Sequence, residues 1–335
     1  MSNKNRSRFS TIISILITAI ILALTGWVVA NREYVRDQVS VWQYQPTEAM
    51  TAIVERSELS DTGMFYLYAS QPEINTSTEF NANCSRQEAG SAILGCYAGG
   101  RIFIYDVENS QLDGIEEVTA AHEMLHAAWD RLDINERNEI TELLEAQYKL
   151  VENDALKARM EYYERTEPGE RANELHSIIA TEVLELDPRL EEYYKTYFDA
   201  RVKIVGLYAG YQQVFDTIST ASKALLAEIT AAAATLDEQS IDYNARASQL
   251  EQEAAALEAR SRTIDRTNSQ EVNAYNRDRA LLIVRINQLD TLRQQIAADS
   301  VRYNAQVVEY NKLVIRSNQL TNSLDSTLTS APALQ

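Results

Sequence analysis

Apolar and polar residues follow three patterns along this chain, and each pattern predicts a different kind of element. Residues 9–30 form an uncharged apolar run, residues 63–107 contain short apolar stretches between turn residues, and residues 115–324 repeat apolar positions at helical spacing. The run of about 22 residues is long enough to cross the hydrocarbon core of a bilayer as one helix. The other two patterns predict a small sheet followed by helices.

The flanks of the apolar run predict its orientation in a membrane. Lys4, Arg6 and Arg8 precede it, whereas the charges that follow it are mixed. The positive-inside rule then keeps the N-terminus in the cytoplasm and sends the body of the chain outside. A cleaved signal peptide is the alternative, with Val28 and Ala30 before the cleavage site, but the run exceeds the usual signal core of about 7 to 15 residues. We therefore expect an uncleaved, single-pass transmembrane anchor in a cell membrane, in the setting of a bacterial envelope.

The middle of the chain is expected to combine a small sheet with helices. Residues 31–62 predict a mostly helical juxtamembrane segment that is broken at Pro46. The aromatic-rich stretch GMFYLYAS, residues 63–70, predicts a strand, and a polar loop follows it to residue 90. Residues 91–97 and 101–107 predict a β-hairpin that reverses at Gly99 and Gly100. Helices are expected near residues 115–132, 135–165, 171–186 and 190–210.

The C-terminal third predicts long helices with coiled-coil seams. Neither glycine nor proline occurs from Tyr211 to Ala331, and apolar residues recur every seven positions in two series. The first series is Ile229, Leu236, Tyr243, Leu250, Leu257 and Ile264, and the second is Tyr275, Leu282, Leu289, Ile296, Tyr303 and Tyr310. The two series are out of phase, which a stutter in one continuous rod or a turn within residues 265–270 would explain. We favour the turn, and hence an antiparallel hairpin with arms of roughly 80 Å.

These patterns together predict an α+β protein that is mainly α. Its expected parts are a cytoplasmic tail and transmembrane anchor (1–30), a juxtamembrane segment (31–62), a domain with the small sheet and the motif described below (63–209), an antiparallel coiled-coil helical hairpin (210–328) and a disordered tail (329–335).

Charge and cysteine content limit the possible functions. The chain has 335 residues and a net charge of −18, so repulsion from phosphate groups argues against nucleic-acid binding. Its two cysteines, Cys84 and Cys96, could form one disulfide in an oxidising compartment outside the cytoplasm, although their spacing alone does not establish the pairing.

The stretch HEMLH, residues 122–126, carries the clearest chemistry. Residues four apart share one face of a helix, so His122 and His126 can direct their imidazoles to one zinc ion. Glu123 follows the first histidine, where it can serve as general base toward a water that the metal activates. This is the H-E-x-x-H arrangement of zinc metallopeptidases.

A third zinc ligand is expected from residues 171–186. Glu182 lies within the apolar stripe of that helix, where a buried carboxylate requires a cation, and it is our first choice of metal ligand. His176 and Glu174 are the alternatives. If His176 is not a ligand, we expect it to contribute to catalysis beside the ligands or at the developing oxyanion.

Residues 60–190 resemble a zincin metallopeptidase of the gluzincin group. The resemblance rests on HEMLH and on NELHS, residues 173–177, which is similar to the Asn-Glu-x-x-Ser start of the thermolysin-type ligand helix. Ile178 stands where that pattern carries an aspartate, and the gap between the two motifs is longer than in thermolysin-like enzymes. The resemblance implies a glutamate as third ligand, which favours Glu174, and a substrate extended along an edge strand, for which 101–107 is the candidate.

The sequence therefore predicts a membrane-anchored, extracytoplasmic zinc metallopeptidase that acts on a peptide or protein substrate. The coiled coil would be a spacer, a site for a protein partner or a means of self-association. The alternative is a non-catalytic envelope protein that uses the anchor and coiled coil for structure or interaction and has a structural or vestigial zinc site.

Overall fold

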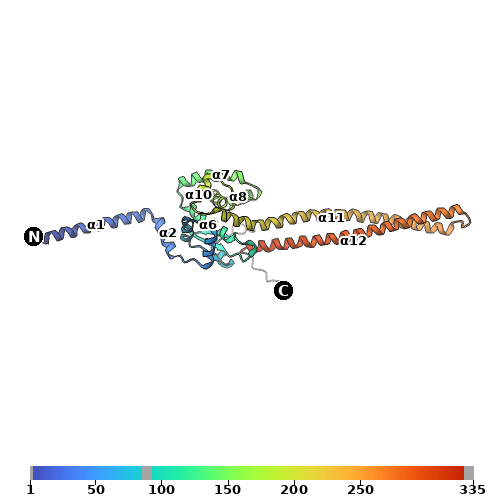
Figure 1. Ribbon diagram of the computed structural model, residues 1–335, viewed down its shortest axis with the longest axis horizontal. Coiled ribbons are helices and arrows are strands. Elements are labelled where there is room, and N and C mark those ends of the chain that lie inside the picture. Colours follow the sequence, from blue (N-terminus) through green and yellow to red (C-terminus); the bar gives the residue numbers. More distant parts are fainter. Residues whose placement is uncertain (1–2, 85–92, 328–335) are drawn as a thin grey trace. The chain divides into compact units, whose positions relative to one another are not determined.

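The computed structural model describes residues 3–84 and 93–327 (Figure 1). Of residues 3–13 and 15 it describes the backbone alone. This part of the chain is α+β and mainly α, with a small three-stranded sheet, as the sequence predicts. The expected tail 329–335 lies outside the described residues.

The N-terminal segment begins with two helices that meet at a sharp bend. Helix α1 spans Asn3–Ala30 and α2 spans Arg32–Gln43, and the axes of Leu16–Ala30 and Arg32–Gln43 differ by 86°. Among the residues with described side chains, no single helix meets the length and apolarity needed to span a membrane, whereas this bent pair meets them jointly.

The chain breaks at Pro46 as expected, and two further helices follow. Helix α3 spans Glu48–Ser57, and Thr47 caps it by accepting a hydrogen bond from the backbone N–H of Met50. The strand predicted at 63–70 is wrong, because this stretch lies in helix α4, Asp61–Ala69. Ser60 caps α4 at Gly63, and the aromatic side chains that suggested a strand instead contact aromatic residues of several other elements. The local cap signal outweighs β-propensity here.

The sheet has the order β1–β3–β2. Strand β1, Glu73–Asn75, pairs in parallel with β3, Arg101–Tyr105, and β2, Gly95–Ala98, pairs antiparallel with β3. The β2–β3 hairpin reverses at Gly99 and Gly100, both at positive φ, as predicted. Strand β1 and helix α5, Ser77–Asn83, replace part of the loop expected at 71–90. A short 3₁₀ turn at Ser110–Leu112 leads to the helices.

Five helices build most of the core. They are α6 (Ile115–Arg131), α7 (Ile134–Val151), α8 (Asp154–Thr166), α9 (Arg171–Glu182) and α10 (Pro188–Tyr194). The single helix expected at 135–165 is two helices, because Asn153 caps a new start at α8. Helix α9 ends at Glu182 rather than near residue 186. The buried Arg201 guanidinium donates to the backbone carbonyls of Ala180, Val183 and Leu184, which ends the helix.

The C-terminal helices form the hairpin and not a continuous rod. Helix α11 spans Arg201–Thr263 and α12 spans Ser269–Leu324 (Figure 1). Arg260 pairs with Asp278 and Gln239 with Asp299, so the arms run antiparallel. Both heptad series are the less exposed positions of their arms.

Two compact units divide the chain. One contains Met1–Val214 and the chain from Leu320 onward, and the other is Phe215–Gln319, so the boundary falls inside α11. The expected hairpin domain, 210–328, therefore loses its C-terminal end to the first unit. There Ser326 accepts a hydrogen bond from the side chain of Asn81 through its carbonyl, and Ser323 bonds Asn109.

Candidate metal centre

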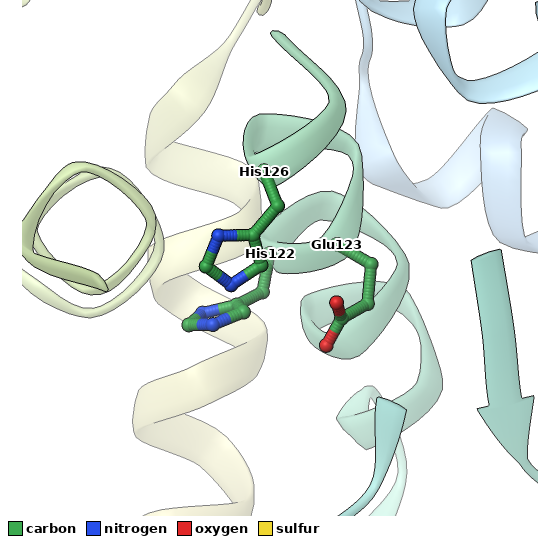
Figure 2. Close-up of side chains that lie close together, drawn as sticks. All are labelled: His122, Glu123 and His126. Atoms are coloured by element: carbon green, nitrogen blue, oxygen red, sulfur yellow. The ribbon is translucent and has the colours of Figure 1, made fainter. Parts of the chain in front are cut away.

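Helix α6 carries the two histidines on one face. Glu116 and Glu117 lie in its first turn, where carboxylates favour a helix start, and nearly all the residues from 117 to 129 are buried. His122 and His126 lie one turn apart with ring centroids separated by 4.8 Å. Figure 2 shows the two imidazoles one above the other, with Glu123 beside them. One donor atom from each of the three residues lies within 4.8 Å of the others.

Helix α9 brings a third donor, Glu174, to the two imidazoles. Glu174 Oε1 is 3.5 Å from His126 Nε2, and Oε2 is 3.8 Å from His122 Nε2. The carboxylate is buried, and Oε2 has no hydrogen-bond partner. Burial, with the charge of Glu167, raises the pKa of Glu174 to about 8. A buried carboxylate oxygen without a partner is costly, so this position suits a cation.

A hydrogen-bond chain fixes the tautomer of His126. Its Nδ1 lies 2.9 Å from Asn173 Oδ1, and Asn173 Nδ2 donates to Glu170 Oε2 at 2.9 Å. Because the amide nitrogen is already donating to Glu170, the amide oxygen faces the ring and accepts from Nδ1–H. The lone pair of the imidazole is then on Nε2, the atom that faces Glu174. Metal-binding histidines are held in this way in many proteins.

The spacing of these donors fits a tetrahedral metal ion. Bonds of roughly 2.0 to 2.2 Å in tetrahedral geometry separate neighbouring donors by about 3.3 to 3.6 Å. The two measured separations, 3.5 and 3.8 Å, are close to that range. Two imidazoles and a carboxylate are the donor set of catalytic zinc sites, which leave a fourth position open. The residues present therefore fit Zn²⁺.

The protonation states of the α6 residues suit the same chemistry. Burial, with His126 nearby, lowers the pKa of His122 well below its usual value, so the ring is neutral and able to bind a metal. Burial raises the pKa of Glu123 to about 7, although a hydrogen bond from the backbone N–H of Tyr97 opposes the rise. A carboxyl with that pKa exchanges protons readily near neutral pH.

Strand β2 forms one wall of a cavity of about 770 Å³ around these residues. Helices α6, α8 and α9 supply most of the other lining side chains. Gly95 is needed where β2 approaches α6, because a Cβ there would lie 2.6 Å from Glu123 Oε1. The cavity therefore joins the metal donors, a general base and a strand in one place.

The strand at the cavity is not the one expected. The sequence favoured 101–107, but β3 lies between β1 and β2, whereas β2 is an edge strand among the described residues. Tyr105 donates to the carbonyl of Leu94, so the alternation of an antiparallel pair directs the polar backbone groups of Gly95 and Tyr97 away from β3. The hydrogen bond from Tyr97 N–H to Glu123 agrees with this direction.

The structure does not bring Glu182 beside the two imidazoles. Its two oxygens accept hydrogen bonds from Arg159 Nη1 and Nη2 at 2.8 and 2.6 Å. The expectation that a carboxylate in the apolar stripe needs a cation is correct, but the cation is a guanidinium on α8. The structure places Glu174, one of the two alternatives, beside both imidazoles instead.

His176 is a core residue and lies outside the cavity lining. It is fully buried, its Nε2 is 2.9 Å from the Tyr193 hydroxyl, and aromatic rings of Trp129, Tyr194 and Tyr197 surround it. Burial lowers its pKa to about 3. The structure therefore does not bring His176 into the cavity with Glu123 and the two other histidines, and nothing in its surroundings supports the expected role at the oxyanion.

Sequence reasoning did not identify the roles of Asn173, Gly95 and Arg159. Asn173 had a signal, since it opens the NELHS stretch that resembles a ligand helix. Gly95 and Arg159 had none, because their importance depends on how α6 packs against β2 and α8.

No protein-family model matches the chain, and no curated protein or solved structure is significantly similar to it. What this centre can do is therefore inferred from its donor atoms and its cavity.

Proposed function

We propose that this protein is a zinc-dependent peptidase anchored in a membrane. The observation that carries the proposal is the Glu174 carboxylate, which faces both imidazoles from a buried position with one oxygen unpaired. His122, His126 and Glu174 are the proposed zinc ligands, and Glu123 is the proposed general base. A purely structural zinc site requires neither a fourth open position nor a base in the same cavity.

The chemistry follows from the placement of Glu123. When bound, Zn²⁺ supplies Lewis acidity, which lowers the pKa of a water molecule and polarises a carbonyl group. Glu123 accepts a proton from the water as the water oxygen attacks the peptide carbonyl carbon, and the carbonyl π electrons move to the carbonyl oxygen. Glu123 then gives the proton to the amide nitrogen, the C–N bond breaks, and a carboxylic acid and an amine leave.

Strand β2 is the proposed platform for the peptide. Gly95 N–H and the carbonyls of Gly95 and Tyr97 face away from β3, so an extended peptide can pair with them as an added strand. The wall that carries these groups also contacts Glu123. Pairing along β2 would therefore bring a peptide bond to the base and the metal together.

The proposed location is outside the cytoplasm, with the N-terminus inside. The basic residues before the uncharged run of residues 9–30 support this orientation. The bond between Cys84 and Cys96 supports it independently, because disulfides persist in oxidising compartments. The α11–α12 hairpin is proposed as a spacer or a docking arm for another protein.

Zinc content and peptide cleavage test the proposal on the full chain in detergent. The wild type is expected to hold one equivalent of zinc and to cleave a random peptide library. Glu123→Gln should keep the zinc and lose cleavage, and Glu174→Gln should lose the zinc. Glu145→Gln, which removes a partner of Arg171 outside the cavity, is the control and should change neither property.

Two results would contradict the proposal. Zinc-free protein at saturating metal would reject the centre itself. Zinc-loaded protein in which Glu123→Gln cleaves as fast as the wild type would reject the catalytic assignment and favour a structural zinc site in an interaction protein.

A further inference from the structure

The cavity contains one cationic side chain that the proposed ligands and base do not account for. Arg159 of α8 lines the cavity together with His122, Glu123 and Glu174, and it is the only lysine or arginine among the described residues that line it. Carboxylates dominate the remaining charged lining, which also includes Asp130 and Glu170. Arg159 is therefore the one lining residue among those described that can offer a permanent positive charge to a ligand in this cavity.

Glu182 holds this guanidinium in a fixed orientation. The two hydrogen bonds, at 2.8 and 2.6 Å, form a bidentate pair, and the Glu182 side chain is only 12% exposed. A guanidinium has five N–H groups, and this pair uses two of them. Glu182 and Glu174 lie on the same helix, α9. The pair with Glu182 therefore fixes the guanidinium relative to the helix that carries a proposed metal ligand.

Arg159 lies close enough to the proposed centre for its charge to act on His122 and Glu174, and all three residues line the same cavity. Two other donors, His176 and Tyr163, are less suitable for a developing negative charge in this cavity. His176 is enclosed by aromatic rings, and Tyr163 already hydrogen-bonds Glu174.

We propose that Arg159 is a catalytic residue that donates an N–H to the carbonyl oxygen of the scissile peptide bond. This inference rests on the proposed peptidase function. As the water oxygen bonds to the carbonyl carbon and Glu123 takes its proton, the π electron pair moves to the carbonyl oxygen, and the guanidinium stabilises that negative charge. When the C–N bond breaks, the electron pair returns to form the C=O bond of the product, and Arg159 is unchanged.

The first test separates kcat from KM with Arg159→Gln in the full chain. Loss of an oxyanion donor is expected to lower kcat by about 10²- to 10³-fold with little change in KM. Arg159→Lys should recover part of the loss, because it keeps the charge but not the planar fork. Arg171→Gln is the matched control, since Arg171 also forms a bidentate pair with a glutamate, Glu145, but does not line the cavity.

The second test does not require turnover. A phosphonate peptide mimics the tetrahedral adduct, and its affinity should fall by a factor similar to the loss in kcat/KM. The affinity of the uncleaved peptide, measured in the Glu123→Gln background, should change little. Zinc content is measured in each variant and should stay at the wild-type value. The double variant R159Q/E182Q removes both charges, so that a fold defect from an unpaired Glu182 is not mistaken for lost catalysis.

The outcomes separate this inference from the proposed function. If Glu123→Gln abolishes cleavage while Arg159→Gln and R159Q/E182Q keep the wild-type kcat and phosphonate affinity, Arg159 is not the donor and the peptidase proposal stands. If Glu123→Gln itself cleaves at the wild-type rate, both proposals are overturned.

Discussion

Acid is expected to destabilise this protein through His176, and the effect can be isolated with one substitution. The ring is fully buried among aromatic side chains, and burial lowers its pKa from the usual 6.5 to about 3. The folded state therefore resists protonation, whereas the unfolded chain accepts a proton once the pH falls below 6.5. Stability from this residue is complete above pH 6.5 and is lost progressively as the pH falls toward 3.

The size of the effect follows from that difference in pKa. Each pH unit below 6.5 lowers the free energy of unfolding by about 1.4 kcal/mol, so the loss at pH 5 is about 2 kcal/mol. Burial raises the pKa of Glu123 and Glu174, and their titration therefore stabilises the fold as the pH falls. A comparison with a variant that lacks only the His176 titration cancels these contributions.

His176→Phe is that variant, because phenylalanine keeps an aromatic ring of similar size among the aromatic neighbours of residue 176. Urea unfolding of the full chain in detergent, with a chelator present, is followed by tryptophan fluorescence at pH 7 and pH 5. The wild type should lose about 2 kcal/mol more than His176→Phe between the two pH values. Equal losses in the two proteins would mean that His176 is protonated in the fold, and the description of its site would be refuted.

Three further substitutions test the cavity and its surroundings. Gly95→Ala should lower cleavage by at least about 10-fold with zinc content unchanged, because the new Cβ would displace the Glu123 carboxylate; a peptidase assay with metal analysis checks this. Asn173→Ala should weaken zinc binding by about 10- to 100-fold, measured by competition with a chelator, since His126 loses the partner of its Nδ1–H. Replacing Cys84 and Cys96 by serine should lower the free energy of unfolding by about 3 kcal/mol in urea, because the cross-link no longer restricts the unfolded chain. Unchanged cleavage, unchanged zinc affinity or unchanged stability, respectively, would contradict each expectation.

Local patterns in the sequence predicted the elements whose geometry is local. The pairing of His122 with His126 depends only on helical spacing, and the long arms depend on the absence of helix breakers after Gly210. The prediction of a strand at 63–70 was wrong because the aromatic residues of this stretch pack against other elements from a helix. β-Propensity alone cannot reveal such packing.

The sequence could not settle which carboxylate lies beside the imidazoles, because this depends on how two helices pack. Glu174 and Glu182 lie on the same helix, and the side that faces α6 is decided by tertiary contacts. The argument that Glu182 needs a cation was sound, but the sequence gives no sign that Arg159, 23 residues earlier, supplies it. Likewise, only the order of the strands shows that β2 and not β3 has a free edge.

The disulfide affects the order of the cavity wall that β2 forms. Cys96 lies on β2 between the two residues whose backbone groups face the cavity, and its bond ties this four-residue strand to the end of α5. Before the thiols are oxidised, only the hydrogen bonds to β3 and the contact with α6 hold this short strand, and fraying there would separate it from Glu123. The order of this wall therefore depends on an oxidising environment, and the chain with reduced thiols is expected to have a less ordered cavity than the chain with the disulfide.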